Sequence, residues 1–574
     1  MTLGRRARIF RPVRLIVVLL RNLVGLLRAP WLLLRRLRMG RGWVHVRLRA
    51  RIVAVPRPRP FWSRWVPGAA QTTPTPLSLL IELTEAIEKD AHVDGVLVEI
   101  PPLAAGWAVL ADVRELLGRL RRRGKRVVAY LPEGGGHREL YLASAADRVL
   151  AGRHATFAWS GLASVRRYAR PLLARLGVSL EVHRRAEYKT AVEGLVEEAM
   201  TEPQREQVQA LLDAMEGELR HALGERGLDG PRIDALFQRV LLTAEEGVAE
   251  GLLDAVVHDD EVAGALAPSG SAPRLIRAGP YLASRASRLL APLFPPRIAA
   301  IVPVHGAITE LGPPGAASRD QLVPTLRRLA VDRRVGAVVL HVDSPGGSAL
   351  ASERIHREVE LLAAHKPVVA CFGDVAASGG YYVAAGAHAI VARPQTLTGS
   401  IGVVSARLVA SELLGSIGVS TEVVKNAPSA DFLVNPRPST DAEKAVLERS
   451  VQAFYDRFLE VVGRGRRMTR DAVDAIARGR VWAGVDAHRH GLVDRIGGMA
   501  DAVAEARARA GARLDPVVTW PSGGEEPPVP SVGPRASAHA LLSRVDPELV
   551  ELAGLVLSGN ERVLAYATDL PRIG

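Results

Sequence analysis

The sequence has 574 residues, 48% of them hydrophobic, which is enough apolar material for two to four folded domains. Its formal net charge of +14 is unevenly distributed, because residues 1–80 contain 17 arginines, no lysine and no carboxylate before Glu82. The remaining residues carry a net charge of about −3, so no nucleic-acid-binding body is expected. A single cysteine, Cys371, excludes an intramolecular disulfide framework.

The first 42 residues are predicted to associate with a membrane. Residues 15–34 (LIVVLLRNLVGLLRAPWLLL) are long enough to span it, but Arg21 and Arg28 interrupt them at a cost of about 2.5–3.5 kcal/mol each near the bilayer centre. A seven-residue spacing places four arginines on one helix face: Arg14, Arg21, Arg28 and Arg35. This pattern favours a helix that lies in the membrane interface, with a transmembrane helix as the alternative.

The rest of the chain contains an internal repeat. The stretch KRVVAYLPEGGGHRELYLASAADRVLA from Lys125 aligns without a gap with KPVVACFGDVAASGGYYVAAGAHAIVA from Lys366, at an offset of 241 residues. The same offset places LGVSLEVHRR, around Gly177, on IGVSTEVVKN, around Gly418. Each copy alternates short β-branched runs with helical stretches, which predicts two homologous α/β domains, each with a largely parallel sheet and surrounding helices.

These patterns divide the chain into five parts. They are a basic membrane-associating segment (1–42), an N-terminal repeat domain (43–266), a linker rich in Pro, Ala, Ser and Gly (267–297), a C-terminal repeat domain (298–512), and a Pro/Gly-rich linker with a helical tail (513–574). No function is assigned to the tail.

The two copies differ where residues carry chemistry. Ser378 follows a predicted strand at the start of a helix in AASGGYY, and the first copy has His137 there. The turn DSPGGS at 343–348 aligns with PPLAAG in the first copy, where Ala104 and Ala105 stand opposite Gly346 and Gly347. Conversely, Lys189 in EYKTAVEG aligns with Ala430 of the second copy. We therefore expect one site that uses residues from both copies, within one chain or between chains.

These residue types suit attack on an acyl carbon. A serine hydroxyl is a good nucleophile only when a base removes its proton, and Ser378 sits where a helix start exposes backbone N–H groups. Glycines allow backbone amides to approach a substrate carbonyl oxygen, and each such donor is worth about 2.7–4 kcal/mol in the transition state. The candidate oxyanion-hole residues are Gly346, Gly347 and Gly379.

The candidate base is Lys189. A lysine accepts a proton only when its amine is neutral, so burial has to bring its pKa well below the usual value of about 10.4. Ser400 in TLTGSIGV is a candidate to hold the amine by a hydrogen bond. The two residues would then support acylation of Ser378 and hydrolysis of the acyl-enzyme by lysine-activated water.

Other sites have less support. His341, His388 and Asp374 lie near the motifs and suggest a Ser-His arrangement, but His388 aligns with Asp147 in a helical stretch. The HRH sequence at 488–490 lacks further residues at metal-ligand spacing. There is no GxxxxGK[ST] phosphate loop. The sequence thus predicts neither a metal nor a cofactor.

The motifs DSPGGSALASE, GDVAASGGYYVA, TLTGSIGV and EYKTAVE, within about residues 80–510, resemble signal peptide peptidase A (protease IV) in its long two-domain form. The resemblance implies a tandem repeat of crotonase- and Clp-protease-like domains, with Ser378 as nucleophile and Lys189 as general base. It also implies that Gly346 and Gly347 form the oxyanion hole and that Ser400 supports the lysine. The glycine that usually precedes Tyr-Lys in this family is replaced by Ala186.

The resemblance further implies a serine endopeptidase that hydrolyses residual signal peptides or similar apolar peptides. It implies a homotetramer at the bacterial inner membrane, with the catalytic body on the periplasmic side. Two alternatives stay open: an acyl-CoA enzyme of the crotonase type, which needs neither Ser378 nor Lys189, and a catalytically inactive membrane scaffold.

Overall fold

The computed structural model describes residues 22–23, 26–27, 29–30, 40–55, 74–266, 272–285, 297–312, 316–511, 514, 517–519 and 564–566. Most of the predicted membrane-associating segment and of the predicted tail lies outside these residues. Within the part of the chain that the structure describes, no helix combines the length and apolarity needed to cross a membrane.

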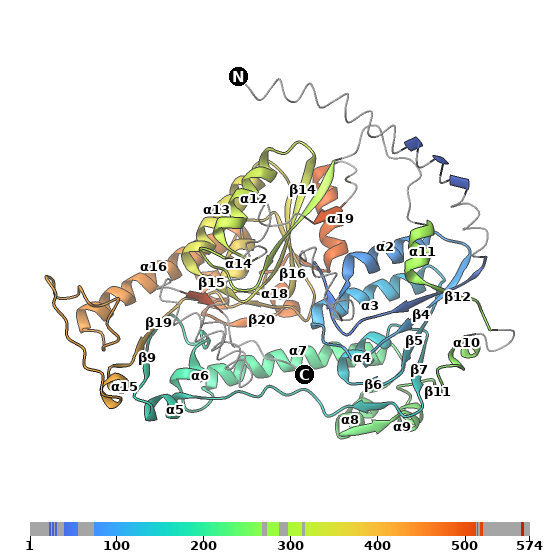
Figure 1. Cartoon of the computed structure of the whole chain (residues 1–574), viewed down its shortest axis with the longest axis horizontal. Helices are drawn as coiled ribbons and strands as arrows, with labels where there is room; N and C mark the ends of the chain where they lie inside the picture. The colour runs from blue at the N-terminus through green and yellow to red at the C-terminus, as the bar shows by residue number, and fades with distance from the viewer. Residues whose placement is uncertain are drawn as a thin grey trace, which may run out of the picture. The chain divides into compact units, whose positions relative to one another are not determined.

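The chain forms two compact units, whose helices and strands are labelled in Figure 1. Of the described residues, those before Leu162 and those from Leu219 to Arg297 belong to unit 1. Those from Leu162 to Glu218 and from Ile298 onward belong to unit 2.

Unit 1 is built on a six-stranded sheet in the order β11-β7-β5-β4-β1-β12, and all its neighbouring strands are parallel. The strands are β1 (Gly42–Arg47), β4 (Val93–Glu99), β5 (Arg126–Leu131), β7 (Arg148–Gly152), β11 (Ala255–Val257) and β12 (Leu275–Arg277). Small sheets add β2 (Ile52–Val53), β3 (Thr75–Pro76), β6 (Gly134–Gly135), β8 (Thr156–Ala158) and β10 (Leu241–Thr243).

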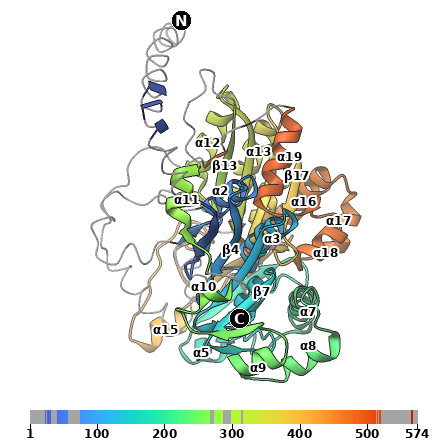
Figure 2. The ribbon, with the colours of Figure 1, turned by 90° about the vertical axis from the view of Figure 1, so that its right-hand side faces the viewer.

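Seven helices are described wholly within unit 1, and several can be followed in Figure 2. They are α2 (Leu77–Glu88), α3 (Trp107–Arg122), α4 (His137–Ala143), α8 (Gly230–Phe237), α9 (Ala244–Ala249), α10 (Val262–Ala265) and α11 (Ala278–Arg285). Helix α3 buries an apolar face that includes Leu110, Val113 and Leu117, as expected for an amphipathic helix that covers a sheet.

Unit 2 has a sheet in the order β20-β18-β16-β14-β13-β22, with β17 also paired to β16 and β21 paired to β17. Its strands pair in parallel except for β18 with β20. The strands are β13 (Ile298–His305), β14 (Val335–Ser344), β16 (Val368–Ala377), β17 (Ala389–Ala392), β18 (Leu397–Gly399), β20 (Val481–Ala483), β21 (Arg495–Ile496) and β22 (Val517–Thr519). Strand β14 is buried along nearly its whole length, as expected for a parallel strand covered on both faces.

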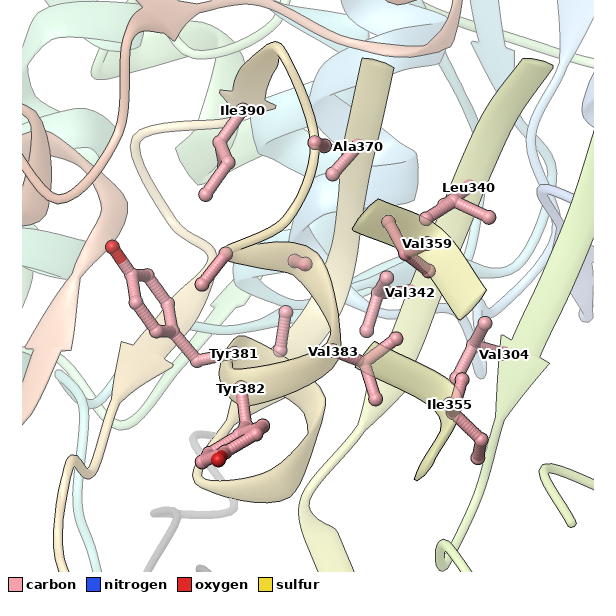
Figure 3. Close-up of a cluster of buried hydrophobic side chains, with 14 of the residues drawn as sticks. Val304, Leu340, Val342, Ile355, Val359, Ala370, Tyr381, Tyr382, Val383 and Ile390 are labelled. Carbon is pink, nitrogen blue, oxygen red and sulfur yellow. The ribbon is translucent and has the colours of Figure 1, made fainter. Parts of the chain in front are cut away.

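The helices of unit 2 enclose its main core, part of which is drawn in Figure 3. The figure shows Leu340 and Val342 of β14 packed with Ile355 and Val359 and with Val383. The helices are α5 (Arg170–Arg175), α6 (Glu193–Val196), α12 (Arg319–Val331), α13 (Ala349–Ala363), α14 (Gly379–Ala384), α15 (Ser411–Ser416), α16 (Asp441–Arg466), α17 (Arg470–Ile476), α18 (Gly484–Arg489) and α19 (Met499–Ala510). Helix α7 (Glu202–Gly224) begins in unit 2 and ends in unit 1.

A second sheet of unit 2 joins strands from distant parts of the sequence, in the order β15-β23-β19-β9. They are β9 (Ser179–Arg184), β15 (Gly346–Ser348), β19 (Val404–Val409) and β23 (Leu564–Tyr566). Strands β9 and β19 pair antiparallel over six residues. Figure 1 shows them side by side.

Both units contain the predicted largely parallel sheet with surrounding helices, so the predicted α/β fold class is confirmed. The contacts differ from the sequence-based division in one respect. Residues 162–218, which the repeat assigns to the N-terminal domain, pack in unit 2 because β9 adds to β19 of the second copy. The boundaries 43–266 and 298–512 therefore stay a prediction about homology, while residues 162–218 pack with the second copy.

Candidate active site

Ser378 lies at the junction of β16 and α14 in unit 2 and is completely buried. Its backbone has φ 54° and ψ −118°, an unusual conformation for a residue with a Cβ. The Ser378 N–H donates to the carbonyl of Gly399 at 2.8 Å, and its carbonyl accepts from the Tyr382 N–H at 2.8 Å. The surrounding hydrogen bonds hold this sharp strand-to-helix turn, a kind of local strain that clusters at functional sites.

Lys189 reaches Ser378 although the two are 189 residues apart in sequence. Its Nζ donates to Ser378 Oγ at 2.8 Å, to Ser400 Oγ at 2.9 Å and to the Ser400 carbonyl at 3.0 Å. The side chain of Lys189 is only 1% exposed. The sequence-predicted residues Ser378, Lys189 and Ser400 are thus brought together within one unit.

The backbone around Lys189 is fixed to the segment that precedes β20. The Tyr188 N–H donates to the Arg478 carbonyl at 3.1 Å. A Cβ built on Gly479 would lie 2.5 Å from the Lys189 nitrogen, and Gly479 has φ +78°. A Cβ on Gly402 would lie 3.2 Å from Cδ of Lys189. Two glycines therefore permit the close approach that buries the lysine.

Helix α7 contributes a buried amide to the same region. Gln207 donates from Nε2 to Thr190 Oγ1 at 2.7 Å and accepts from the Val481 N–H at Oε1 at 3.2 Å. It thus links the residue after Lys189 to the first residue of β20. Neither Gln207 nor Gly479 was a predicted site residue. In this part of the repeat the offset is 240, because GLLDAVV from Gly251 aligns with GLVDRIG from Gly491. Gly479 then aligns with Arg239, so a residue-by-residue comparison of the copies identifies it as a difference.

Ala186 departs from the motif of the resembled family, and the structure shows what the departure involves. Its φ is +71°, in the region that favours glycine. The Arg185 N–H donates to the Val403 carbonyl at 3.1 Å, and the Lys189 N–H donates to the Ala186 carbonyl at 3.4 Å. The chain keeps the turn that positions Lys189 although the glycine is missing.

The glycine turn after β14 lies beside the start of α14. Gly346 has φ +104° and Gly347 has φ +151°, and a Cβ on Gly347 would lie 2.2 Å from the Ile308 carbonyl oxygen. A Cβ on Gly380 would lie 2.8 Å from the Ser344 carbonyl oxygen. Ser344 also pairs with Ala376 in the parallel register of β14 and β16. The predicted glycine turn and the predicted nucleophile therefore occupy the same end of two adjacent strands.

A strand from the C-terminal part of the chain runs along this turn. β23 pairs antiparallel with β15 through Gly346–Tyr566, Gly347–Ala565 and Ser348–Leu564, and on its other side Leu564 pairs with Val404 of β19. An extended segment thus lies between the glycine turn and β19.

The histidines considered as alternative bases lie elsewhere. His388 is exposed, and its Nδ1 contacts the Val368 N–H at 3.1 Å, at the opposite end of β16 from Ser378. His341 is buried and contacts His305, with 2.6 Å between Nδ1 and Nε2. Burial, and then the neighbouring His305, hold the pKa of His341 well below its usual value. In the HRH sequence, His488 contacts the Val493 carbonyl at 3.0 Å.

The aligned position in unit 1 is filled by aromatic rings. His137, which aligns with Ser378, begins α4 and packs against Trp159, which aligns with Ser400; their ring centroids are 4.4 Å apart. Burial and the neighbouring Arg138 lower the pKa of His137 to about 4. Unit 1 therefore has the fold at this position without the serine hydroxyls.

Comparison with known proteins agrees with this arrangement. A profile described as Peptidase family S49 matches residues 119–269 and 360–513, more than half of the chain. The chain belongs to peptidase family S49. The resemblance inferred from the motifs is thereby confirmed.

Three relatives of this S49 chain illustrate the match. Serine protease SPPA, chloroplastic, of Arabidopsis thaliana is 32% identical over 445 residues, 75% of this chain and 65% of that protein. Protease 4 of Salmonella typhi is 31% identical over 442 residues, 74% of this chain and 71% of the relative. Protease 4 of Haemophilus influenzae is 32% identical over 451 residues, 75% and 72%. The chain thus spans about two thirds of the length of these relatives.

Proposed function

We propose that this S49 family member is a serine endopeptidase in which Ser378 is the nucleophile and Lys189 the general base. The observation that carries the proposal is the 2.8 Å contact between Lys189 Nζ and Ser378 Oγ at a buried position. Burial disfavours the charged form of an amine, and a neutral amine is the form that accepts a proton.

The contacts of the amine suit this role. A neutral amine has two N–H groups and one lone pair. The Ser400 carbonyl and Oγ, at 3.0 and 2.9 Å, are positioned to accept the two N–H groups, which leaves the lone pair for the Ser378 hydroxyl proton. Ser400 is thus proposed as a positioning residue.

In the proposed mechanism, Ser378 Oγ attacks the carbonyl carbon of the scissile peptide bond while Lys189 Nζ takes the hydroxyl proton. Backbone N–H groups of Gly347 and Gly379 stabilise the negative charge that develops on the carbonyl oxygen. The predicted third donor, Gly346, instead donates its N–H to Ser344 Oγ at 3.2 Å. The Lys189 ammonium then protonates the leaving amine, which departs and leaves an ester on Ser378. Water, deprotonated by the neutral lysine, hydrolyses this ester and restores the free serine.

The substrate is proposed to bind as an extended strand. β23 demonstrates that an extended segment fits between β15 and β19, and pairing with β15 would bring a substrate carbonyl beside the glycine turn. A further relative, 36% identical over 206 residues (35% of this chain and 60% of that protein), is named Putative signal peptide peptidase SppA, of Enterococcus faecium. That name supports residual signal peptides or similar apolar peptides as substrates, and the apolar, arginine-rich N-terminal segment supports membrane association. A periplasmic catalytic body and a homotetramer complete the proposal.

Covalent labelling tests the proposed nucleophile and base. A fluorescent fluorophosphonate should modify the wild-type protein at Ser378, as located by peptide mass spectrometry, and should not modify Ser378→Ala. Lys189→Met should fold normally and lose at least 100-fold in labelling rate, while Lys425→Met, whose lysine is on the surface, should label like the wild type. Absence of wild-type labelling would favour the scaffold alternative. Turnover of an acyl-CoA thioester by Ser378→Ala would favour the crotonase alternative.

Substrate and location need separate measurements. A library of internally quenched peptides should show preference for apolar residues around the cleaved bond, and preference for charged residues would contradict this part of the proposal. Proteinase K added to spheroplasts should degrade the catalytic body if it is periplasmic. Protection until the membrane is lysed would place it on the other side.

A further inference from the structure

Arg480 contacts two parts of the chain that position the amine of Lys189. Its backbone carbonyl, directly before β20, accepts the Ser400 N–H at 2.7 Å. Ser400 in turn accepts from Lys189 Nζ at 2.9 Å through its Oγ and at 3.0 Å through its carbonyl. The residue that accepts from the lysine amine is therefore held by the main chain of Arg480.

The side chain of Arg480 reaches the segment that carries the lysine. Its Cζ lies 4.9 Å from the ring centroid of Tyr188, the residue before Lys189. A guanidinium at this distance over an aromatic ring is attracted by the negative face of the ring. Arg480 therefore contacts Ser400 through its carbonyl and the lysine segment through its guanidinium.

A carboxylate of α7 joins the arginine to the tyrosine. Glu206 accepts from Arg480 Nη1 through Oε1 and from the Tyr188 hydroxyl through Oε2, both at 2.6 Å. The hydrogen bond from Tyr188 lowers the pKa of Glu206, and the same bond raises the pKa of Tyr188. The carboxylate thus stays charged and the hydroxyl stays protonated near neutral pH. Under these conditions Arg480, Glu206 and Tyr188 form one connected cluster.

Trp482 gives the guanidinium a second aromatic contact. Arg480 Cζ is 4.4 Å from the ring centroid of Trp482. The Trp482 Nε1–H donates to the Ile476 carbonyl at 2.9 Å, which fixes the indole. The Arg480 side chain is only 20% exposed. A planar guanidinium can make an ion pair and aromatic contacts at once, so these contacts select arginine over lysine at this position.

We propose that Arg480 is a positioning residue for Lys189 and that it acts with Tyr188 and Glu206 to hold the amine at the Ser378 hydroxyl. The inference rests on the proposed function, in which Lys189 is the general base. A base has to lie within hydrogen-bond reach of the proton that it removes. A displacement of about 1 Å can reduce the rate about 100-fold, even when the altered residue lies away from the reacting atoms.

The repeat distributes this cluster between the copies as it distributes the serine and the lysine. At the offset of 241, Tyr188 of the first copy aligns with Ser429 of the second. At the offset of 240, Arg480 of the second copy aligns with Val240 of the first, whose side chain is 77% exposed. Neither copy alone has both the tyrosine and the arginine. The contact is thus specific to the part of the molecule that holds Lys189 and is not a general requirement of the fold.

A double-mutant cycle, read out by fluorophosphonate labelling of Ser378, tests the role of Arg480. Arg480→Met should lower the second-order rate constant for labelling at least tenfold, and Lys189→Met should lower it at least 100-fold. Because Arg480 is proposed to act through the lysine, the double variant should label no more slowly than Lys189→Met alone. A loss in the double variant equal to the product of the two single losses would overturn the proposal.

A second variant tests the link through the tyrosine. Tyr188→Phe retains the ring under the guanidinium and removes the hydroxyl that donates to Glu206. It should lower the labelling rate constant about threefold, and this loss should also vanish in the Lys189→Met background. This cycle does not depend on the folding of Arg480→Met. A threefold loss that persists without the lysine would contradict the proposal.

Arg489→Met is the matched control, because Arg489 forms an ion pair with Asp486 at 2.7 Å and its side chain is 71% exposed. It should label like the wild type. Melting temperatures close to wild type would show that the variants fold. A folded Arg480→Met protein that labels at the wild-type rate would overturn the positioning role. Absence of labelling in the wild type would instead contradict the proposed function, so the two failures are distinguishable.

Discussion

The backbone nitrogen of Lys189 lies so close to Gly479 that a Cβ there would be 2.5 Å away. Gly479→Ala should therefore displace the lysine from Ser378 and reduce kcat on a quenched peptide by at least tenfold. Gly251→Ala is the matched control, because Gly251 has φ +79° but open space around it. Both variants should lose about 1 kcal/mol of stability from the positive φ, whereas only Gly479→Ala should lose activity.

The hydrogen bonds from Lys189 to Ser400 predict a change in the pH profile. Activity should rise with pH as the amine becomes neutral, which gives the profile an acid limb. A hydroxyl acceptor stabilises the ammonium more than the neutral amine, so Ser400→Ala should move the midpoint of this limb to lower pH. Ser400→Ala should also lower kcat about tenfold, because the lone pair of Lys189 Nζ would be less well oriented toward the Ser378 hydroxyl. If kcat falls while the midpoint pH of the acid limb stays the same, Ser400 has only a structural role.

A residue of this site can be predicted from the sequence when it belongs to a motif or differs between the two copies of the repeat. Ser378 and Lys189 were predictable because the repeat supplies an internal reference, in which the aligned residues are His137 and Ala430. Gln207 was not predictable, because a buried glutamine that bridges Thr190 and Val481 has no motif of its own. Gln207 makes these two hydrogen bonds only in the folded chain, where α7 lies next to the start of β20.

The fold likewise has features that the sequence predicts and one that it does not. Alternating β-branched and helical stretches predicted two α/β copies, since periodicity is a local signal. The packing of residues 162–218 in unit 2 was not predicted, because strand pairing depends on which sheet edge is free rather than on the strand's own sequence. β9 has the same pattern as 420–425, yet only β9 is paired.

Ala186 occupies a positive-φ position at φ 71°. Ala186→Gly should remove this strain, but glycine also increases the conformational entropy of the unfolded chain, which lowers stability. The net effect should be a rise of about 0.5 kcal/mol in the free energy of unfolding. Ala186→Val should lower it by more than about 1 kcal/mol, because branching at Cβ makes positive φ more costly. Urea unfolding of the three proteins checks the order. A more stable Val variant would contradict it.

His137 makes the stability of unit 1 depend on pH. Its pKa of about 4 in the folded state lies below the usual 6.5, so its contribution is fully present above pH 6.5 and is lost as the pH falls toward 4. The loss should approach about 3 kcal/mol, at about 1.36 kcal/mol per pH unit. His137→Phe, which preserves the packing on Trp159, should flatten this dependence in urea unfolding at pH 7 and pH 4.5. An unchanged slope would exclude His137 as its source.

β23 lies where the peptide substrate is proposed to bind, so it should compete with substrate. Deleting residues 564–574 should lower KM for a quenched peptide severalfold and leave kcat nearly unchanged, because the strand pairs with β15 without contributing to the proposed chemistry. Ala565→Pro is the matched point variant, since proline lacks the N–H that a paired strand can donate. It should lower KM in the same direction, and a peptide of residues 562–568 added in trans should restore the higher KM. A deletion that lowers kcat and leaves KM unchanged would instead show that β23 supports the glycine turn.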